Sequence, residues 1–186
     1  MKSVLISIQP YWVFLIIAKI MGWNIGKQKT VEVRKNYPKC ENWDNVAKIY
    51  CSKDKRSFAK IPKEYQPLMD RFLGKVIGEF VCDEIIVAPC GEYCKIPLAE
   101  AHLDSLDLMD YADGKTVYGW HISDLKIYDK PKKLDDFHKP CEEVENCWNK
   151  AFREAGHCLD KCFDCGNRIK RPPQSWCYVE GKDDQK

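Results

Sequence analysis

Three charged residues stand close together in segment 28–34, where apolar and polar side chains alternate as in a half-buried strand. Lys29 and Arg34 are natural contacts for a phosphate or a base, because Lys offers a compact charge and Arg a planar fork of donors. Glu32 between them could accept a hydrogen bond from an exocyclic amine. The alternative is that Glu32 and Arg34 form a surface ion pair, worth under about 1 kcal/mol.

Aromatic and polar residues in other segments could complete such a site. Single-stranded nucleic acids stack their bases on aromatic rings, at about 1–3 kcal/mol per base, and Trp12, Trp120 and Trp176 could serve in this way or pack in the core. His121 follows Trp120 on a strand, so the two side chains point to opposite faces, and His121 is either a cleft residue or a hydrogen-bonded structural histidine. Gln9 precedes a helix start, where free backbone amides attract anions. The candidate nucleotide contacts are Gln9, Trp12, Lys29, Glu32, Arg34, Trp120 and His121.

A cluster of cysteines between residues 138 and 170 indicates a metal site. Cys162 and Cys165 have the spacing that lets two thiolates hold one tetrahedral ion, and Gly166 suits the tight turn that follows. In a reducing compartment this pattern favours structural Zn²⁺ over disulfides, and the alternative is a set of free thiols on a segment that packs on the main fold. Cys90 and Cys94 are a weaker second pair. The predicted ligands are Cys141, Cys147, Cys162 and Cys165, with Cys158 or His157 as competitors.

Length and composition fit one globular domain. The chain has 186 residues, with 45% hydrophobic and 31% charged residues, and a formal charge of +2, which does not suggest wholesale polyanion binding. The first 40 residues are more basic, with seven Lys and Arg against one acidic residue. Eleven cysteines without a visible cleavable leader predict a cytoplasmic protein with free or metal-bound thiols.

An apolar run at 4–23 raises the question of a membrane span. Pro10 divides it and Lys19 lies inside its second part, so neither part has the roughly 20 apolar residues that a spanning helix needs. The run predicts a buried strand at 4–8 and then a core helix with Pro10 in its first turn, where proline is tolerated. We therefore expect no membrane association.

The remaining segments predict more strands than helices. Segment 52–63 is basic and polar and predicts a loop, a proline at 97 begins a helix that runs to about residue 111, and Pro131 should end the strand before it. Glycines at 74 and 78 indicate a turn and a bulge. With five or six strands and two or three helices, we expect an α+β fold built on a mixed β barrel. The predicted strands are 4–8, 28–34, 46–51, 74–87, 117–128 and 176–179.

Four segments, taken together, resemble the ASCH domain family of the PUA-like superfamily. They are SVLISIQP at 3–10, GKQKTVEVR at 26–34, GKVIGEF at 74–80 and WHISDL at 120–125. The ending RPPQSWCY at 171–178 is similar to that of the phage and prophage branch of the family. The resemblance implies a PUA-like pseudo-barrel formed by 1–137 and 171–180. Residues 138–170 would then be a Cys-rich insert, and 181–186 a polar tail.

The resemblance also implies a function. Family members are generally inferred to bind RNA or a modified nucleotide in a cleft beside the first helix, so we expect single-stranded RNA or a modified nucleotide as the partner. A few small members are amidohydrolases that cleave acylated cytidines with a Lys, a Thr and a Glu. Lys29 matches that Lys, Glu32 stands at the position of the Thr, and the Glu has no match here. An accessory domain that binds a phage or host protein is a third possibility.

Overall fold

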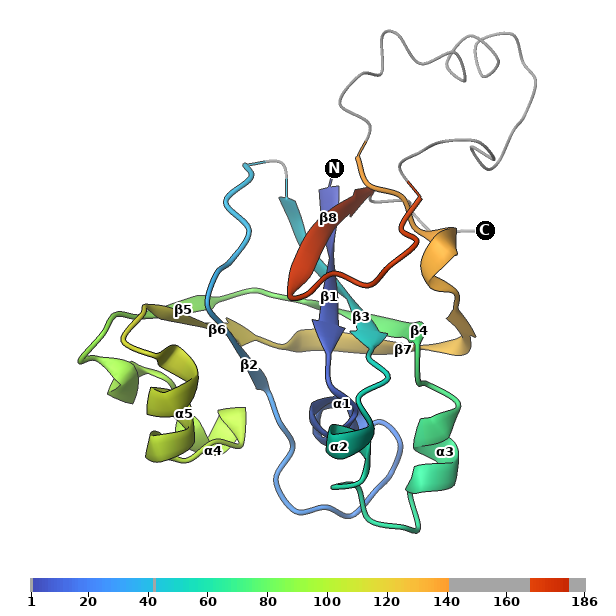
Figure 1. The fold of residues 1–186 in the computed structure, drawn as a ribbon, viewed down its shortest axis with the longest axis horizontal. Coiled ribbons are helices and arrows are strands. Elements are labelled where there is room, and N and C mark those ends of the chain that lie inside the picture. The colour runs from blue at the N-terminus through green and yellow to red at the C-terminus, as the bar shows by residue number, and fades with distance from the viewer. Residues whose placement is uncertain (1, 42, 141–167, 181–186) are drawn as a thin grey trace, which may run out of the picture.

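The computed structural model describes residues 2–41, 43–140 and 168–180, which form two β-sheets with helices at one end (Figure 1). One sheet contains β1 (Lys2–Ile8), β3 (Trp43–Cys51), β4 (Lys75–Val81), β7 (Ser123–Lys132) and β8 (Trp176–Glu180), in the order β7-β4-β3-β1-β8. The other contains β2 (Val31–Arg34), β5 (Ile85–Ala88) and β6 (Val117–His121), in the order β2-β6-β5. This confirms the expected mixed α+β class, as two sheets rather than a closed barrel.

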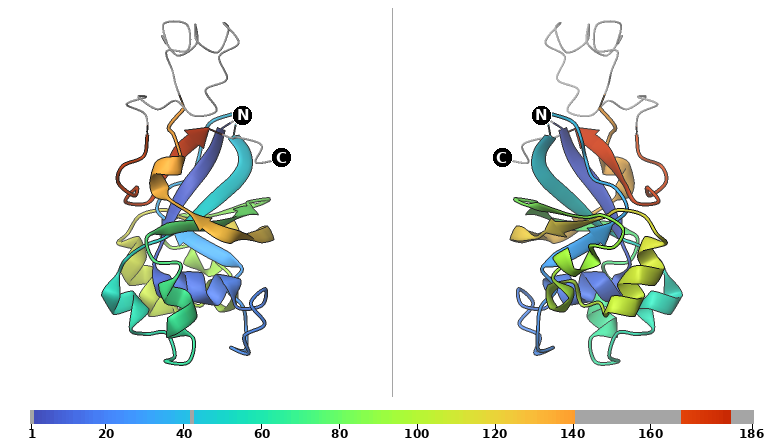
Figure 2. Two further views of the ribbon diagram at one scale, coloured as in Figure 1. Left: turned by 90° about the vertical axis from the view of Figure 1, so that its right-hand side faces the viewer. Right: turned by 90° about the vertical axis from the view of Figure 1, so that its left-hand side faces the viewer.

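The described part of the chain contains five short α-helices. They are α1 (Pro10–Ile17), α2 (Lys55–Phe58), α3 (Gln66–Asp70), α4 (Leu98–Ala101) and α5 (Ser105–Ala112), with single 3₁₀ turns η1 (Tyr93–Lys95) and η2 (Leu134–Asp136). The α-helices gather toward the end of the sheets where β1 finishes, as the side views show (Figure 2). None of the helices in the described ranges is long and apolar enough to cross a membrane.

The main core lies between α1 and the five-stranded sheet. Helix α1 is apolar on nearly all sides, which is typical of a helix buried in the core, and Val13, Ile16 and Ile17 are fully buried. Strand β1 pairs in parallel with β3, so Ile8 lies opposite Cys51 where both strands end. Helix α1 begins directly after β1, and α2 a few residues after β3. The parallel pairing therefore brings two strand ends and two helix starts to one place.

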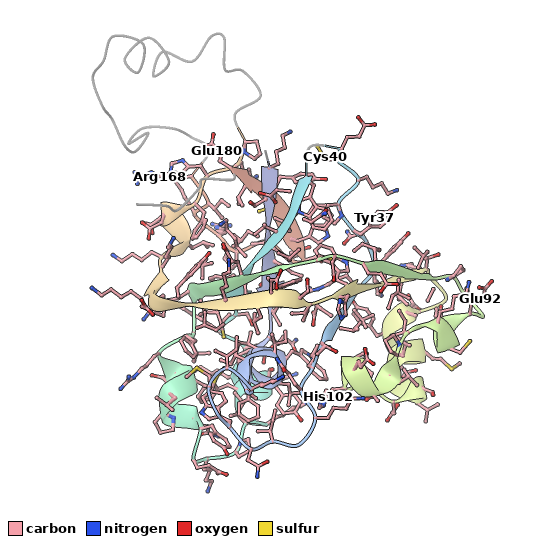
Figure 3. All side chains as sticks on the ribbon, turned by 180° about the vertical axis from the view of Figure 1, so that it is seen from behind. Tyr37, Cys40, Glu92, His102, Arg168 and Glu180 are labelled. Atoms are coloured by element: carbon pink, nitrogen blue, oxygen red, sulfur yellow. The ribbon has the colours of Figure 1, made fainter. Side chains whose placement is uncertain are left out.

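The expected helix at 97–111 is two helices in the structure. His102 ends α4 in the left-handed conformation, with φ of 55°, and this conformation breaks the helical path. Asp104 then begins α5, since its side chain accepts a hydrogen bond of 2.7 Å from the amide of Asp107. Figure 3 shows His102 at the end of the molecule that carries these helices. The prediction of a single helix was therefore wrong, because the left-handed residue His102 interrupts it, and sequence periodicity does not reveal such a break.

The expected strand at 117–128 is also divided, and its halves belong to different sheets. Strand β6 ends at His121 and β7 begins at Ser123. Ile122 between them donates its amide to the carbonyl of Thr30 at 2.8 Å, in the register that pairs β6 with β2, whereas Ser123 already lies opposite Val81 of β4. Strand β7 also continues past Pro131 to Lys132, because β7 is an edge strand, where a missing amide donor is tolerated.

The middle of the chain contains two short helices that the sequence did not predict. The segment at 52–63 contains α2 rather than only a loop, because Asp54 caps it by accepting from the amide of Ser57 at 2.8 Å. Helix α3 was not predicted.

The prediction of a turn at Gly74 and a bulge at Gly78 is confirmed. Gly74 has φ of 73° before β4, and the pairing of β4 with β7 shifts register next to Gly78. A side chain at Gly78 would collide with the carbonyl oxygen of Lys126.

The two ends of the range 138–170 lie side by side. His138 and Arg168 form an antiparallel bridge, and the amide of Ile169 donates to the carbonyl of Phe137 at 3.0 Å. Arg168 and Glu180 lie at the same end of the molecule, away from the α-helices (Figure 3). This is the arrangement expected where an insert leaves and rejoins a domain. The boundaries of the insert itself stay a prediction.

Candidate functional site

A pocket of about 560 Å³ opens where the two sheets meet the helical end of the molecule. We call it the charged pocket. Its lining comes from both sheets, from the starts of α1 and α2, and from α5. The lining residues are Ser7, Gln9, Trp12, Lys29, Glu32, Val33, Arg34, Ser52, Asp54, Lys60, Leu103, Asp107, Tyr111 and Gln174.

Three segments singled out in the sequence meet at this pocket. Segment 3–10 supplies Ser7 and Gln9, segment 26–34 supplies Lys29, Glu32, Val33 and Arg34, and the terminal block supplies Gln174. The terminal block reaches the pocket because β8 pairs antiparallel with β1, and the amide of Ser7 donates to the carbonyl of Ser175 at 2.8 Å. The long-range pairing of the chain's two ends therefore builds one wall of the pocket.

Lys29 lines the charged pocket and is almost fully buried, with 2% of its surface exposed. Its ammonium donates to the carbonyls of Val31 and Ala101, each at 2.7 Å, and lies 5.0 Å from the ring centre of Trp12. Burial lowers the pKa of Lys29, although the carboxylate of Glu32 partly offsets this effect. The ammonium of Lys29 therefore links β2 to α4, and the same residue forms part of the pocket wall.

Glu32 and Arg34 form a buried ion pair beside Lys29. Arg34 Nη2 lies 2.9 Å from Glu32 Oε1, and Lys29 Nζ lies 3.5 Å from Glu32 Oε2. Only 7% of the Glu32 side chain and 11% of the Arg34 side chain are exposed, so the pair is not the solvated surface pair considered as the alternative. Arg34 Nη2 also donates to the carbonyl of Ser7 at 2.6 Å and so ties the two sheets together.

Two of the candidate contacts lie elsewhere. Trp120 is fully buried, donates to the carbonyl of Asn36 at 3.3 Å, and packs against Trp176 with ring centres 6.1 Å apart, so it is a core residue. His121 Nδ1 lies 2.6 Å from a carboxylate oxygen of Asp83 and does not line the charged pocket. The hydrogen bond from His121 lowers the pKa of Asp83. The structure thus brings together Gln9, Trp12, Lys29, Glu32 and Arg34.

Several lining residues were not predicted. Ser52 and Asp54 follow β3, and only the parallel pairing of β1 with β3 brings them to the pocket. Asp107 and Tyr111 are four residues apart on α5, a spacing that places them on the same helix face and could have marked them as a pair. Burial raises the pKa of Tyr111, and the ammonium of Lys35 lies 5.2 Å from its ring centre.

The predicted zinc ligands, Cys141, Cys147, Cys162 and Cys165, and their competitors Cys158 and His157, lie outside the described residues. Within ranges 2–41, 43–140 and 168–180, no group of three or more His, Cys, Asp or Glu side chains could hold a metal. Cys90 and Cys94 are exposed free thiols. Burial raises the pKa of the Cys51 and Cys82 thiols to about 12, so neither is a nucleophile near neutral pH.

A second hollow of about 580 Å³ lies on the loop that follows α1. We call it the loop hollow. Its cations, Lys19 and Lys27, are exposed, and Trp23 stacks on Phe14 with ring centres 5.3 Å apart. Its lining residues are Ala18, Lys19, Trp23, Ile25, Gly26, Lys27, Gln28, Thr30 and Glu100.

By sequence, no protein-family model and no curated protein matches the chain. By structure, it is similar to the crystal structure of ASCH from Zymomonas mobilis, with a TM-score of 0.53, 16% identity, and coverage of 96% of this chain and 87% of that chain. Two single-residue mutants of that protein give TM-scores of 0.53 and 0.54, at 16% and 17% identity; the matches cover 97% and 96% of this chain and 91% and 88% of theirs. The described part of the chain therefore shares the fold of a solved ASCH protein.

Proposed function

We propose that this protein is an ASCH-type module that binds single-stranded RNA or a modified nucleotide, with one base held in the charged pocket. The observation that carries the proposal is the buried group of Lys29, Glu32 and Arg34, which faces a pocket that also contains Trp12 and Tyr111. Buried charges fixed by several partners are preorganised to recognise a polar ligand. The ending RPPQSWCY at 171–178, which is similar to that of the phage and prophage branch, supports a relationship to that branch.

The composition of the pocket favours a base over a polyphosphate. Its volume falls in the range of about 300–1,000 Å³ that is usual for small-molecule sites, and its lining has three cations and three carboxylates. A hollow with balanced charge does not concentrate a highly charged anion. A base offers a flat face for Trp12 or Tyr111 and an edge of donors and acceptors for Glu32 and Arg34.

Hydrolysis of an acylated nucleoside is the second candidate, favoured by the lowered pKa of Lys29. The contacts of Lys29 support a binding role more strongly, because each of the three donors of its ammonium already has an acceptor nearby. These acceptors are the carbonyls of Val31 and Ala101 and the carboxylate of Glu32. Incubation with acylated nucleosides followed by chromatography tests this candidate, and product formation that depends on Lys29 would establish it.

Calorimetric titration with nucleoside monophosphates and short single-stranded RNA tests the binding proposal. We expect Trp12→Ala to weaken binding by about 1–3 kcal/mol, through loss of a stacking surface. The matched control is Trp23→Ala, which removes a ring that packs on Phe14 and Tyr65 at the loop hollow. It should lower thermal stability but leave the affinity unchanged. Equal affinity of the Trp12→Ala variant and the wild type would contradict the proposed site.

We also propose that Cys141, Cys147, Cys162 and Cys165 hold one structural Zn²⁺, with Cys158 as a competitor, in a protein of a reducing cytoplasm. The C-x2-C spacing of Cys162 and Cys165 supports this proposal. Elemental analysis should find about one zinc per chain, and a Cys162→Ser, Cys165→Ser variant should lose it. Zinc-free wild-type protein with normal thermal unfolding would refute the site.

A further inference from the structure

Two residues that line the charged pocket each carry a buried polar atom without a hydrogen-bond partner among the described residues. The atoms are Arg34 Nε and Ser52 Oγ. A buried donor left unpaired costs about 1–3 kcal/mol, so native structures contain few of them and each requires an explanation. Both atoms are covered in this conformation but belong to residues that line the same pocket, so a small side-chain shift on ligand binding can complete their hydrogen bonding.

Neighbouring hydrogen bonds fix the positions of both residues, although the Ser52 hydroxyl can still rotate about its Cα–Cβ bond. The guanidinium of Arg34 is held through Nη2 by Glu32 at 2.9 Å and by the carbonyl of Ser7 at 2.6 Å. The backbone of Ser52 is held by its amide, which donates to the carbonyl of Ile8 at 2.9 Å. Ser7 and Ile8 are consecutive residues at the end of β1. Arg34 of the three-stranded sheet and Ser52, which follows β3 of the five-stranded sheet, are therefore both hydrogen-bonded to the end of β1.

The chemistry of the two atoms defines the matching ligand atom. Arg34 Nε is only a donor, and a serine hydroxyl can donate as well, so both can be satisfied by an oxygen acceptor. A carbonyl oxygen of a base and a phosphate oxygen both fit this description. The carboxylates of Glu32 and Asp54, which line the same pocket, disfavour a fully charged phosphate and provide acceptors for a neighbouring N–H of a base.

We propose that Arg34 Nε and Ser52 Oγ form a subsite that donates hydrogen bonds to an oxygen atom of the bound nucleotide. This inference rests on the proposed function and adds Ser52, which the sequence did not indicate, to the binding residues. It predicts that a bound nucleotide gives both donors a partner that none of the described residues supplies.

Calorimetric titration of wild-type and Ser52→Ala protein with a nucleoside and with its 5′-monophosphate tests the subsite. We expect about 5- to 10-fold weaker binding in the variant, as for the loss of one hydrogen bond. Unliganded Ser52→Ala should melt no lower than the wild type, because the hydroxyl that it loses has no partner among the described residues. Ser123→Ala is the control, since that hydroxyl donates to the carbonyl of Val81 at 2.9 Å and does not line the pocket.

The pattern of losses identifies the oxygen. If it belongs to the base, nucleoside and monophosphate lose affinity by the same factor, and if it belongs to the phosphate, only the monophosphate does. Arg34→Lys, which keeps a positive charge but removes Nε, should reproduce the pattern. Wild-type binding with unchanged affinity in Ser52→Ala would overturn the subsite but leave the proposed function intact. Failure of the wild type to bind any nucleotide would overturn both.

Discussion

The charged pocket and the loop hollow have nearly the same volume, about 560 and 580 Å³, but different construction. The charged pocket holds buried charges that several hydrogen bonds fix in place, as for Lys29 and Arg34. The loop hollow has exposed lysines on a connecting segment. The comparison teaches that volume alone does not indicate a binding site, because recognition requires polar groups held in position before the ligand arrives.

One segment forms a wall of both hollows. Lys29 lines the charged pocket, whereas its neighbours Gln28 and Thr30 line the loop hollow. The segment is held from both sides, since the amide of Lys29 donates to the carbonyl of Leu15 at 3.2 Å and the amide of Thr30 to that of Glu100 at 3.0 Å. A substitution in this segment can therefore be tested on either hollow with the other as its control.

The largest expected difference concerns stability. Lys29→Met should lower the free energy of unfolding by about 3–5 kcal/mol, because it removes one partner of a buried ionic group and leaves two carbonyls without their donor. Lys27→Met in the loop hollow should change it by less than about 0.5 kcal/mol, since Lys27 is exposed. Urea denaturation measures both. Equal effects of the two variants would remove the distinction between the hollows.

The next largest effect concerns binding. Tyr111→Ala should weaken nucleotide binding by about 1 kcal/mol or more, because Tyr111 provides an aromatic surface in the charged pocket. The control is Met109→Ala, an exposed residue of the same helix that does not line the pocket. Titration should find its affinity unchanged. If Met109→Ala is the more damaging substitution, the ligand contacts the outer face of α5 instead.

A third prediction uses the titration of Lys29. Burial lowers the pKa of Lys29 from 10.5, so between the folded-state pKa and 10.5 the unfolded chain binds more protons and stability rises with pH. The difference in unfolding free energy between wild type and Lys29→Met should therefore shift in favour of the wild type toward pH 10.5, by at most about 1.4 kcal/mol per pH unit. The opposite contribution of the Cys51 and Cys82 thiols is present in both proteins and cancels. A shift toward the variant would mean that the neighbouring carboxylate outweighs burial.

The smallest effect is expected at the loop hollow. A Lys19→Gln, Lys27→Gln variant should lower affinity for an RNA oligomer by less than about 1 kcal/mol, as for other exposed charges, and should leave mononucleotide binding unchanged. The measurement is titration at two salt concentrations, because any phosphate contact of these lysines weakens as salt rises. A loss greater than that of Tyr111→Ala would make the loop hollow the main site.

Local patterns predicted the elements well where neighbouring residues determine them. The apolar strand and the proline-initiated helix at the start of the chain are confirmed by β1 and α1. The predictions failed where a distant partner decides. The expected strand at 117–128 is divided because β6 pairs with β2 whereas β7 pairs with β4, and the left-handed conformation of His102 separates α4 from α5. No periodicity within either segment encodes these breaks.

The same division applies to the candidate site. Lys29, Glu32 and Arg34 could be found because they lie within six residues of one alternating strand segment. Ser52 could not, because it reaches the pocket only through the register that pairs β1 with β3. Trp120 has the residue type of a stacking platform, but its strand lies at the centre of the three-stranded sheet, and its side chain is buried in the core.

The contact of Arg34 with Ser7 has a practical consequence. Arg34 belongs to the three-stranded sheet and Ser7 to the five-stranded sheet, so any occupant of the pocket touches the junction of the two halves of the fold. A ligand that binds there binds only the folded protein. At 100 times its Kd it would therefore add about 2.7 kcal/mol to the free energy of unfolding. A melting-temperature survey of nucleosides, nucleotides and oligomers could thus reveal the natural ligand before any assay for it exists.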